Sequence, residues 1–433
     1  MVSKFKKIYF NEQQLSEKEK QSSRLLSVFE GCSARTILTL TSGAYIVGYA
    51  KYLGTSDSTA ALISAIPVLS GIAMLISPRL FETIRNHKPL VAFLCFLGRV
   101  LLGTMILVPI FINSVEIRLI SFVMIYFIAN FLLSFTYPGA QSWIQRLTPD
   151  AIKGKYFGSR ESYVLLFVAV VTLLAGRVLD ILKNDGLEFQ GFLIIYLLIF
   201  LMAIVNFVFL SLMKESPIEY KQATPDILSA ISVSLRFEKY RASLILITLW
   251  NFSYQLSFPF TSVLMVSKLK LDYAVITCMC VTAAASSFIF VRLWGRIADK
   301  KTWFFVMKLM VLLQMLSFMA WFFTNESNYM LMIFLAQLFN GAAIAGVNIS
   351  ILNIQFIYSP KENKTVHLGF SSALSSVCGF VGTVVGTWLL KLLQKVDILS
   401  SIGSGEIKVI FCISLILLGI CVKVLESGGT VLN

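Results

Sequence analysis

Charged side chains are scarce in this sequence. Only 14% of its 433 residues are Asp, Glu, Lys or Arg, whereas a soluble globular chain has about 25%. Hydrophobic residues make up 57% of the chain, and the mean hydropathy is +0.79. Apolar stretches of about 20 residues recur along the whole length, and a helix needs that length to cross a hydrocarbon core of about 30 Å. The scarcity of charge excludes a soluble domain and predicts an all-α polytopic membrane protein.

Histidine and paired cysteine are scarce as well. The chain has 2 His and 7 Cys; the cysteines lie in or beside apolar segments and form no CxxC pair, so no metal or redox site is expected. There is no nucleotide-binding loop and no nucleophile–base pair. We therefore expect neither an enzyme nor a cofactor, and the energy for its work must come from solute or ion gradients.

The chain carries an excess of 37 Lys+Arg over 23 Asp+Glu. This excess fits the positive-inside rule better than nucleic-acid binding, because the cations fall mainly in alternate loops.

Twelve apolar windows, separated by charged residues, Pro or Gly, predict twelve transmembrane helices. They form two pseudo-symmetric six-helix bundles, because the one long polar interruption lies midway. The first 30 residues lack the apolar core of a cleavable signal. The distribution of cations places both termini and the central loop in the cytoplasm. The predicted helices span 33–53, 57–78, 89–112, 118–142, 161–183, 189–213, 242–266, 271–294, 302–324, 329–357, 366–392 and 405–425.

The predicted domains follow from this count. An internal repeat supports them: a shift of 213 residues lays "RLFETIRNHK" onto "RLWGRIADKK", and a shift of 211 lays "TPDAIKGKYFG" onto "SPKENKTVHLG". Such parallel repeats are typical of six-plus-six transporters. The domains are a cytoplasmic tail 1–31, an N-terminal bundle 32–213, a cytoplasmic central loop 214–241, a C-terminal bundle 242–425 and a cytoplasmic tail 426–433.

Two loop motifs resemble signatures of the major facilitator superfamily. Gly295 is followed four residues later by Asp299 and then by two lysines. Pro149 is followed by Lys153 and Gly154, similar to that superfamily's Pro-x-x-x-Arg-Gly signature with Lys for Arg. The resemblance covers essentially the whole chain and implies a transporter.

The first-half copy of the loop departs from the signature. Glu82 and Asn86 stand where Gly and Asp are usual. The fifth predicted helix, "LLFVAVVTLLAGRVLD", lacks the Gly-Pro pattern associated with proton-linked drug antiporters. Because of these departures, the resemblance favours a proton-linked drug antiporter less than other transporters of the superfamily.

The second-half loop is predicted to be a cytoplasmic gate. Gly295 allows close helix approach, and a carboxylate at the start of the ninth helix is favoured by the helix dipole. The contact would form only while the cytoplasmic side is closed, and its partner by pseudo-symmetry is the start of the fifth helix. The alternative is a solvated charge cluster that only enforces topology. The gating candidates are Gly295, Arg296, Asp299, Lys301, Asn86 and Arg160.

The resemblance implies that the first, fourth, seventh and tenth helices line a central cavity. Amides in hydrocarbon are costly unless they face partners or water, and aromatic rings interleaved with amides suit a neutral or amphipathic solute. Alternatively, these amides hold helices together. The candidate substrate-binding residues are Tyr45, Asn130, Trp250, Asn251, Tyr254, Gln255, Gln337 and Asn340.

These four helices show no deep Asp or Glu, so no coupling carboxylate is predicted in them. The deep charge is Arg99, in the middle of the third helix. An intramembrane charge is a functional candidate, here for anion attraction or gating; alternatively, Arg99 snorkels or pairs with backbone carbonyls.

The sequence therefore predicts a secondary active transporter of a small organic solute. It would span the cytoplasmic membrane and work as a monomer by alternating access, with the solute and the lipid bilayer as its partners. The alternatives are a lipid or amphiphile flippase, a drug efflux protein on the same scaffold, or a non-transporting membrane receptor.

Overall fold

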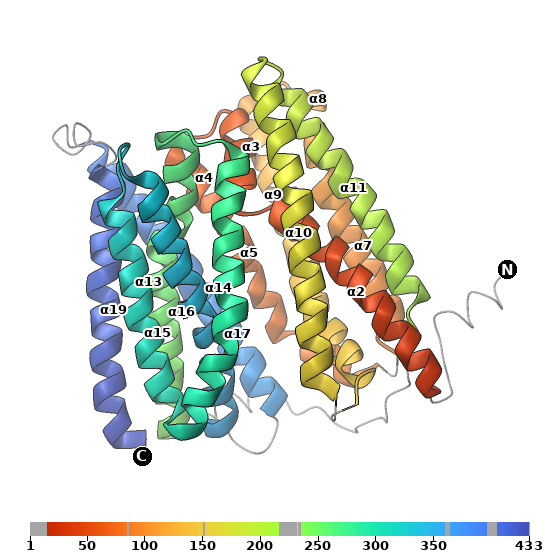
Figure 1. Cartoon of the computed structure of the whole chain (residues 1–433), viewed down its shortest axis with the longest axis vertical. Coiled ribbons are helices and arrows are strands. Elements are labelled where there is room, and N and C mark those ends of the chain that lie inside the picture. The colour runs from red at the N-terminus through yellow and green to blue at the C-terminus, as the bar shows by residue number, and fades with distance from the viewer. Residues whose placement is uncertain are drawn as a thin grey trace. The chain divides into compact units, whose positions relative to one another are not determined.

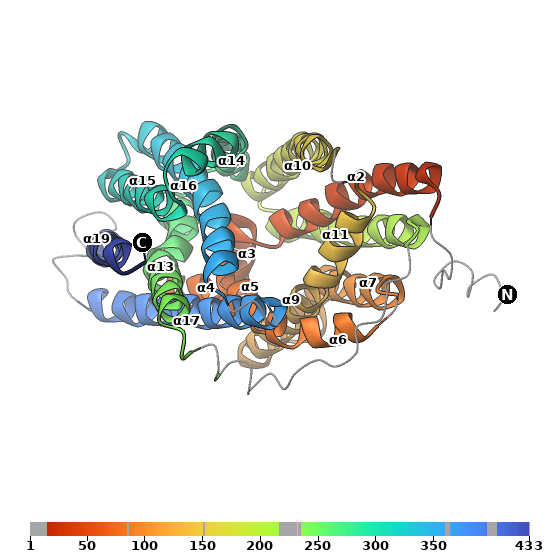
Figure 2. The same cartoon turned by 90° about the horizontal axis from the view of Figure 1, so that it is seen from below.

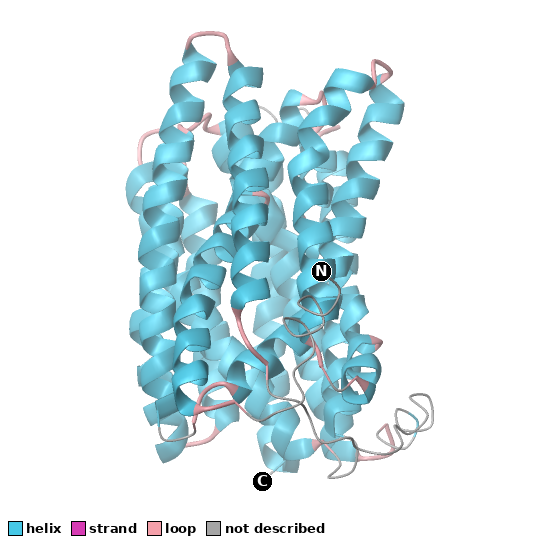
Figure 3. Ribbon diagram, turned by 90° about the vertical axis from the view of Figure 1, so that its right-hand side faces the viewer, coloured by secondary structure: helices cyan, strands magenta, loops and turns pink. Residues whose placement is uncertain are grey.

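The computed structural model describes residues 15–84, 86–149, 152–215, 232, 235–359, 364–395 and 405–432. Throughout these residues the chain forms helices joined by short loops, with no strand (Figures 1 and 3). The all-α fold class is therefore confirmed.

The helices follow one another closely along the chain. In order they are α2 (Glu17–Leu40), α3 (Gly43–Tyr52), α4 (Asp57–Ser64), α5 (Ile66–Ser70), η1 (Gly71–Leu75), α6 (Ser77–Thr83), α7 (Lys88–Thr104), η2 (Met105–Leu107), α8 (Val108–Phe111), α9 (Val115–Arg146), α10 (Lys153–Asn184), α11 (Glu188–Leu212), α13 (Glu238–Val263), η4 (Leu264–Lys268), α14 (Tyr273–Lys300), α15 (Trp303–Phe323), α16 (Tyr329–Tyr358), α17 (Lys364–Leu393) and α19 (Gly405–Leu432).

Ten helical stretches in the described part of the chain are long and apolar enough to cross a membrane. They coincide with ten of the twelve predicted spans. The other two predicted spans, 33–53 and 242–266, coincide with α2–α3 and with α13. The protein is thus a multi-pass membrane protein, and its twelve-span arrangement stays a prediction.

The chain separates into two compact units. One comprises Met1–Gly54 with Ser70–Thr224, and the other Thr55–Leu69 with Pro225–Asn433. In the first unit α2 packs against α10 and α11, and α7 against α9 and α11. In the second unit α13 packs against α17 and α19, and α16 against α14 and α15 (Figure 2).

Residues 55–69 pack with the second unit although the rest of the second predicted span packs with the first. The span is broken into α4, α5, η1 and α6, and α4 lies against α13 and α17. The Lys268 ammonium lies 2.7 Å from Glu406 Oε1 and 3.8 Å from Asp57 Oδ2. These contacts tie the start of α4 to the second unit.

The first helix begins earlier than predicted and is interrupted. Ser16 caps α2 in a capping box with Glu19, which satisfies N–H groups that a helix start leaves free. The helix ends at Leu40, and Gly43 (φ +53°) starts α3 from a backbone region that L side chains rarely adopt. Tyr126 Oη donates to the Thr41 carbonyl at 2.7 Å, which satisfies an acceptor that the interruption frees.

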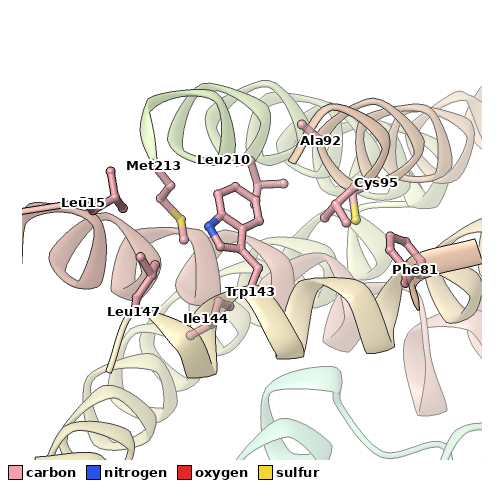
Figure 4. Packing of buried hydrophobic residues seen from close by; sticks show 10 residues of the cluster. Leu15, Phe81, Ala92, Cys95, Trp143, Ile144, Leu147, Leu210 and Met213 are labelled. Carbon is pink, nitrogen blue, oxygen red and sulfur yellow. The ribbon is translucent and has the colours of Figure 1, made fainter. Parts of the chain in front are cut away.

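A buried apolar cluster joins one end of α7, α9 and α11 in the first unit. The Trp143 indole lies between Leu210, Met213 and Ile144, with Ala92 and Cys95 of α7 beside it (Figure 4). Its Nε1 donates to the Lys214 carbonyl at 3.0 Å. The cluster fixes the chain where it leaves α11.

Candidate functional site

The second unit contains a cavity of about 290 Å³ between α13, α16 and α17. Amides, hydroxyls and aromatic rings line it together with aliphatic side chains, and no described lining residue is charged. The lining residues are Ile247, Trp250, Asn251, Tyr254, Gln255, Ile344, Val347, Asn348, Ile351, Gln355, Ser372 and Ser375.

One face of α13 supplies the predicted cluster. Trp250, Asn251, Tyr254 and Gln255 are spaced three and four residues apart, which puts them on the same side of a helix. The Trp250 and Tyr254 rings stack, with centroids 5.8 Å apart and planes 15° apart. Asn251 Nδ2 donates to the Ile247 carbonyl at 3.1 Å, and its Oδ1 accepts no hydrogen bond from the described residues.

Pro259 shapes this stretch of α13. Proline has no N–H, so the carbonyl four residues earlier loses its helical partner. That carbonyl belongs to Gln255, and the Thr383 hydroxyl of α17 donates to it at 3.0 Å. The freed acceptor is thereby satisfied next to the cavity.

The opposite wall comes from α16, which was expected to line the cavity as the tenth helix, and from α17, which was not. Gln355 lies two helical turns beyond Asn348 on α16, and its Nε2 donates to Ser371 Oγ of α17. Ser372 and Ser375 complete the wall from α17, a helix that the resemblance does not place at the cavity. The helical spacing from Asn348 was a signal for Gln355, but no sequence signal distinguished these serines.

Gln337 and Asn340 are buried on α16 and are not among the lining residues of this cavity. Asn340 Oδ1 accepts a hydrogen bond from Tyr254 Oη at 3.3 Å. Asn340 therefore orients the ring that forms part of the wall.

Tyr45 and Asn130 lie in the first unit. Tyr45 Oη donates to the Thr172 carbonyl at 2.8 Å and so links α3 to α10. Asn130 Nδ2 donates to the Tyr126 carbonyl at 2.8 Å within α9. Both side chains are buried, and each has a protein hydrogen-bond partner.

A buried ion network occupies the first unit. The carboxylate of Glu30 on α2 lies 3.6 Å from Arg99 Nη2 and 3.2 Å from Arg160 Nη2. Arg99 Nη1 also donates to Asn206 Oδ1 of α11, and Asn206 Nδ2 donates to Ser33 Oγ at 2.9 Å. Two guanidinium groups thus share one carboxylate.

The predicted span 33–53 contains no Asp or Glu, but the helix begins earlier than predicted and carries a buried carboxylate before that span. Glu30 is 8% exposed and lies three residues before the predicted span, in a stretch read as a tail. Its signal was the i, i+4, i+7 spacing of Ser23, Ser27 and Glu30, but a polar stripe of that kind also describes a solvated face. Arg99 pairs with side chains of α2 and α11 rather than with backbone carbonyls alone.

The predicted position of Asp299 in its helix is wrong. It lies in the last turn of α14, which ends at Lys300, and α15 begins only at Trp303. A carboxylate at a helix C-terminus meets the negative end of the dipole, so the dipole does not stabilise it. Within the second unit, a β-carbon on Gly295 would meet no atom within 4 Å.

The other gating candidates lie at helix ends. Arg296 is exposed on α14, and the Lys301 N–H caps that helix by donating to Ile297 O at 2.9 Å. Asn86 precedes α7, and its Oδ1 is buried without a hydrogen-bond partner in the described part of the chain. Arg160 belongs to the Glu30 network.

A second buried carboxylate, Glu215, follows α11. Its Oε2 accepts the Lys88 N–H at 2.7 Å, and its Oε1 lies 2.7 Å from Arg146 Nη2 and 4.0 Å from His87 Nδ1. Burial raises the pKa of Glu215 above its usual range. Burial and, less strongly, the charge of Arg146 lower the pKa of His87. This network joins the ends of α7, α9 and α11.

These features define a class: an all-helical, multi-pass membrane protein with a polar, uncharged cavity inside one of two units. The Major Facilitator Superfamily pattern matches residues 31–387. The chain belongs to this superfamily, whose members are transporters and generally not enzymes, and the resemblance found in its loops is confirmed. No curated protein sequence gave a significant match.

Solved transporter structures have similar folds at low sequence identity. The POT family transporter PepTSo has a TM-score of 0.70 and 12% identity, covering 96% of this chain and 99% of that chain. A variant of the nucleoside transporter NupG has a TM-score of 0.67 and 13% identity, with 94% and 99% covered. A bacterial homologue of the human lysosomal transporter Spinster, inward-facing and unoccupied, has a TM-score of 0.64 and 13% identity, with 95% and 97% covered.

Proposed function

We propose that this protein is a secondary active transporter of a small neutral organic solute. It moves the solute across the cytoplasmic membrane by alternating access, with both termini in the cytoplasm. The lining of the cavity between α13, α16 and α17 supports a neutral solute. It combines amides, hydroxyls and stacked rings, and none of its described lining residues is charged. A charged solute would lose its hydration there without gaining a counter-ion.

The rings and the amides favour a solute with a flat, hydrogen-bonding part. Trp250 and Tyr254 offer ring surfaces for stacking, while Asn251 and Asn348 offer donors and acceptors to hydroxyl or amide groups. A nucleoside has both features, and one protein of similar fold is a nucleoside transporter. A polar wall of this kind does not favour the flippase alternative.

A thermal-shift screen of the purified full-length protein tests this proposal. The probes are nucleosides, sugars, dipeptides, amino acids and lipophilic cations, and a neutral compound is expected to raise the melting temperature. Asn251→Ala should abolish that shift. Asn353→Ala is the matched control, because Asn353 makes the same bond to the carbonyl four residues earlier, at 2.9 Å, but does not line the cavity. A shift produced only by charged compounds, or one that survives Asn251→Ala, would contradict the proposal.

The Gly295–Lys301 stretch is proposed to close the cytoplasmic side in one state of the cycle. Asp299 is exposed at the end of α14, where the helix dipole does not stabilise it, so its carboxylate can pair with a cationic group outside that helix. The start of α10, near Arg160, is the proposed partner by pseudo-symmetry.

A further inference from the structure

The first unit has a crevice of about 570 Å³ at the N-terminal ends of α2 and α10, which pack side by side (Figure 1). Three cationic side chains and no carboxylate line it, together with polar and apolar residues. Those that the argument uses are Lys18, Arg24, Leu25, Tyr156, Arg160 and Tyr163.

The positive charge of the crevice is not fully balanced. Arg160 is balanced by Glu30 at 3.2 Å and Glu161 at 3.6 Å. Arg24 Nη1 donates to the Leu147 carbonyl at 2.7 Å, a neutral acceptor, and no carboxylate of the described residues lies within 4 Å of its guanidinium nitrogens. Lys18 has no ion pair in the described part of the chain. Lys18 and Arg24 therefore attract an anion.

The same two helices present apolar side chains beside these cations. Leu25 of α2 is 62% exposed, and Tyr163 and Leu166 of α10 are 64% and 66% exposed. In a membrane protein, exposed apolar side chains are suited to contact with acyl chains. An anionic group bound in the crevice would thus lie next to a surface suited to a hydrocarbon tail.

We propose that the crevice binds the phosphate headgroup of an anionic phospholipid, whose acyl chain lies along Leu25 and Tyr163. On the proposed topology these helix ends lie at the cytoplasmic leaflet, which is the anionic one. The lipid is a bound partner here and not the transported solute. Residues 1–14, with three lysines and one glutamate, have the same sign of charge as the crevice and do not complement it.

Lipid binding to the purified full-length protein tests this proposal. Native mass spectrometry in mixed micelles would compare phosphatidylglycerol with phosphatidylcholine, and glycerol 3-phosphate would report a site for a free phosphate. Phosphatidylglycerol is expected to bind in preference. Lys18→Gln should weaken its binding about fivefold, the effect of one cation near a membrane surface. Arg24→Gln should weaken it by a similar factor.

Lys20→Gln is the matched control. Lys20 lies on the same turn of α2 but pairs with Glu17 at 2.9 Å and does not line the crevice, so phosphatidylglycerol binding should be unchanged. Gel filtration and melting without lipid check folding; Lys18 is exposed, so Lys18→Gln should fold normally. Equal binding of the two lipids, an equal loss with Lys20→Gln, or binding of glycerol 3-phosphate as tight as that of the lipid would overturn the proposal.

Discussion

At the scale of single residues, Glu30 is a buried carboxylate of the first unit that is shared by two arginines. It is 8% exposed and faces two guanidinium groups. A buried charge is tolerated only when it is paired and hydrogen-bonded, and the amide of Asn206 and the hydroxyl of Ser33 complete the network. The pairing joins α2, α7, α10 and α11, so the carboxylate holds four helices at one point.

Glu30→Gln is expected to destabilise the protein strongly. The change leaves Arg99 and Arg160 buried without their shared counter-charge, and breaking a buried pair costs about 3–5 kcal/mol. Thermal unfolding of the purified protein measures this loss. Glu161→Gln is the control, because that carboxylate also approaches Arg160 but is half exposed, so its loss should matter little. If the two variants melt at the same temperature, the network does not stabilise the fold.

At the scale of helices, α13 and α17 approach so closely at two glycines of α17 that a side chain is excluded at each. A β-carbon on Gly382 would lie 2.5 Å from the Phe252 carbonyl oxygen, and one on Gly386 would lie 2.3 Å from that of Leu256. Both obstacles are backbone atoms, which cannot rotate away. This close packing places Thr383 against the carbonyl that Pro259 frees in α13.

Gly382→Ala is expected to lower the melting temperature by separating α17 from α13. Forcing extra atoms into a packed interface costs about 1–3 kcal/mol. Gly419→Ala in α19 is the matched control, because a β-carbon there meets no described atom within 4 Å and alanine favours helix. The expectation would be refuted by a Gly382→Ala protein as stable as the wild type.

At the scale of the whole molecule, the proposed transport cycle depends on the Asp299 carboxylate having a partner outside α14. We expect Asp299→Asn to change the alkylation rate of a cysteine placed at Ser375 in a chain without native cysteines, by up to about fivefold, as a surface ion pair allows. Asp272→Asn, at the other end of α14 and without a capping hydrogen bond, is the control. An unchanged rate in Asp299→Asn, or an equal change in both variants, would argue against the latch.

The sequence predicted the parts of the molecule that depend on local pattern. The membrane class follows from composition, and the superfamily from short loop motifs, so both could be recognised without a structure. The α13 side of the cavity was predictable for the same reason, because Trp250, Asn251, Tyr254 and Gln255 share a face through helical spacing alone. The C-terminal end of α14 was predicted too early in the sequence. The loop that follows it has only two residues, Lys301 and Thr302, and so short a loop cannot be recognised within a charged stretch.

Only the tertiary structure decided the features that depend on contacts between distant segments, namely which polar side chains are buried and which ones line the cavity. Glu30 is buried because α10 and α11 cover the middle of α2, and nothing within that stretch distinguishes a covered polar stripe from a solvated one. Ser372 and Ser375 reach the cavity because α17 packs on α13 through glycines. Local spacing fixes which side of a helix a residue occupies, but the neighbouring helix decides whether that side meets water, lipid or a charge.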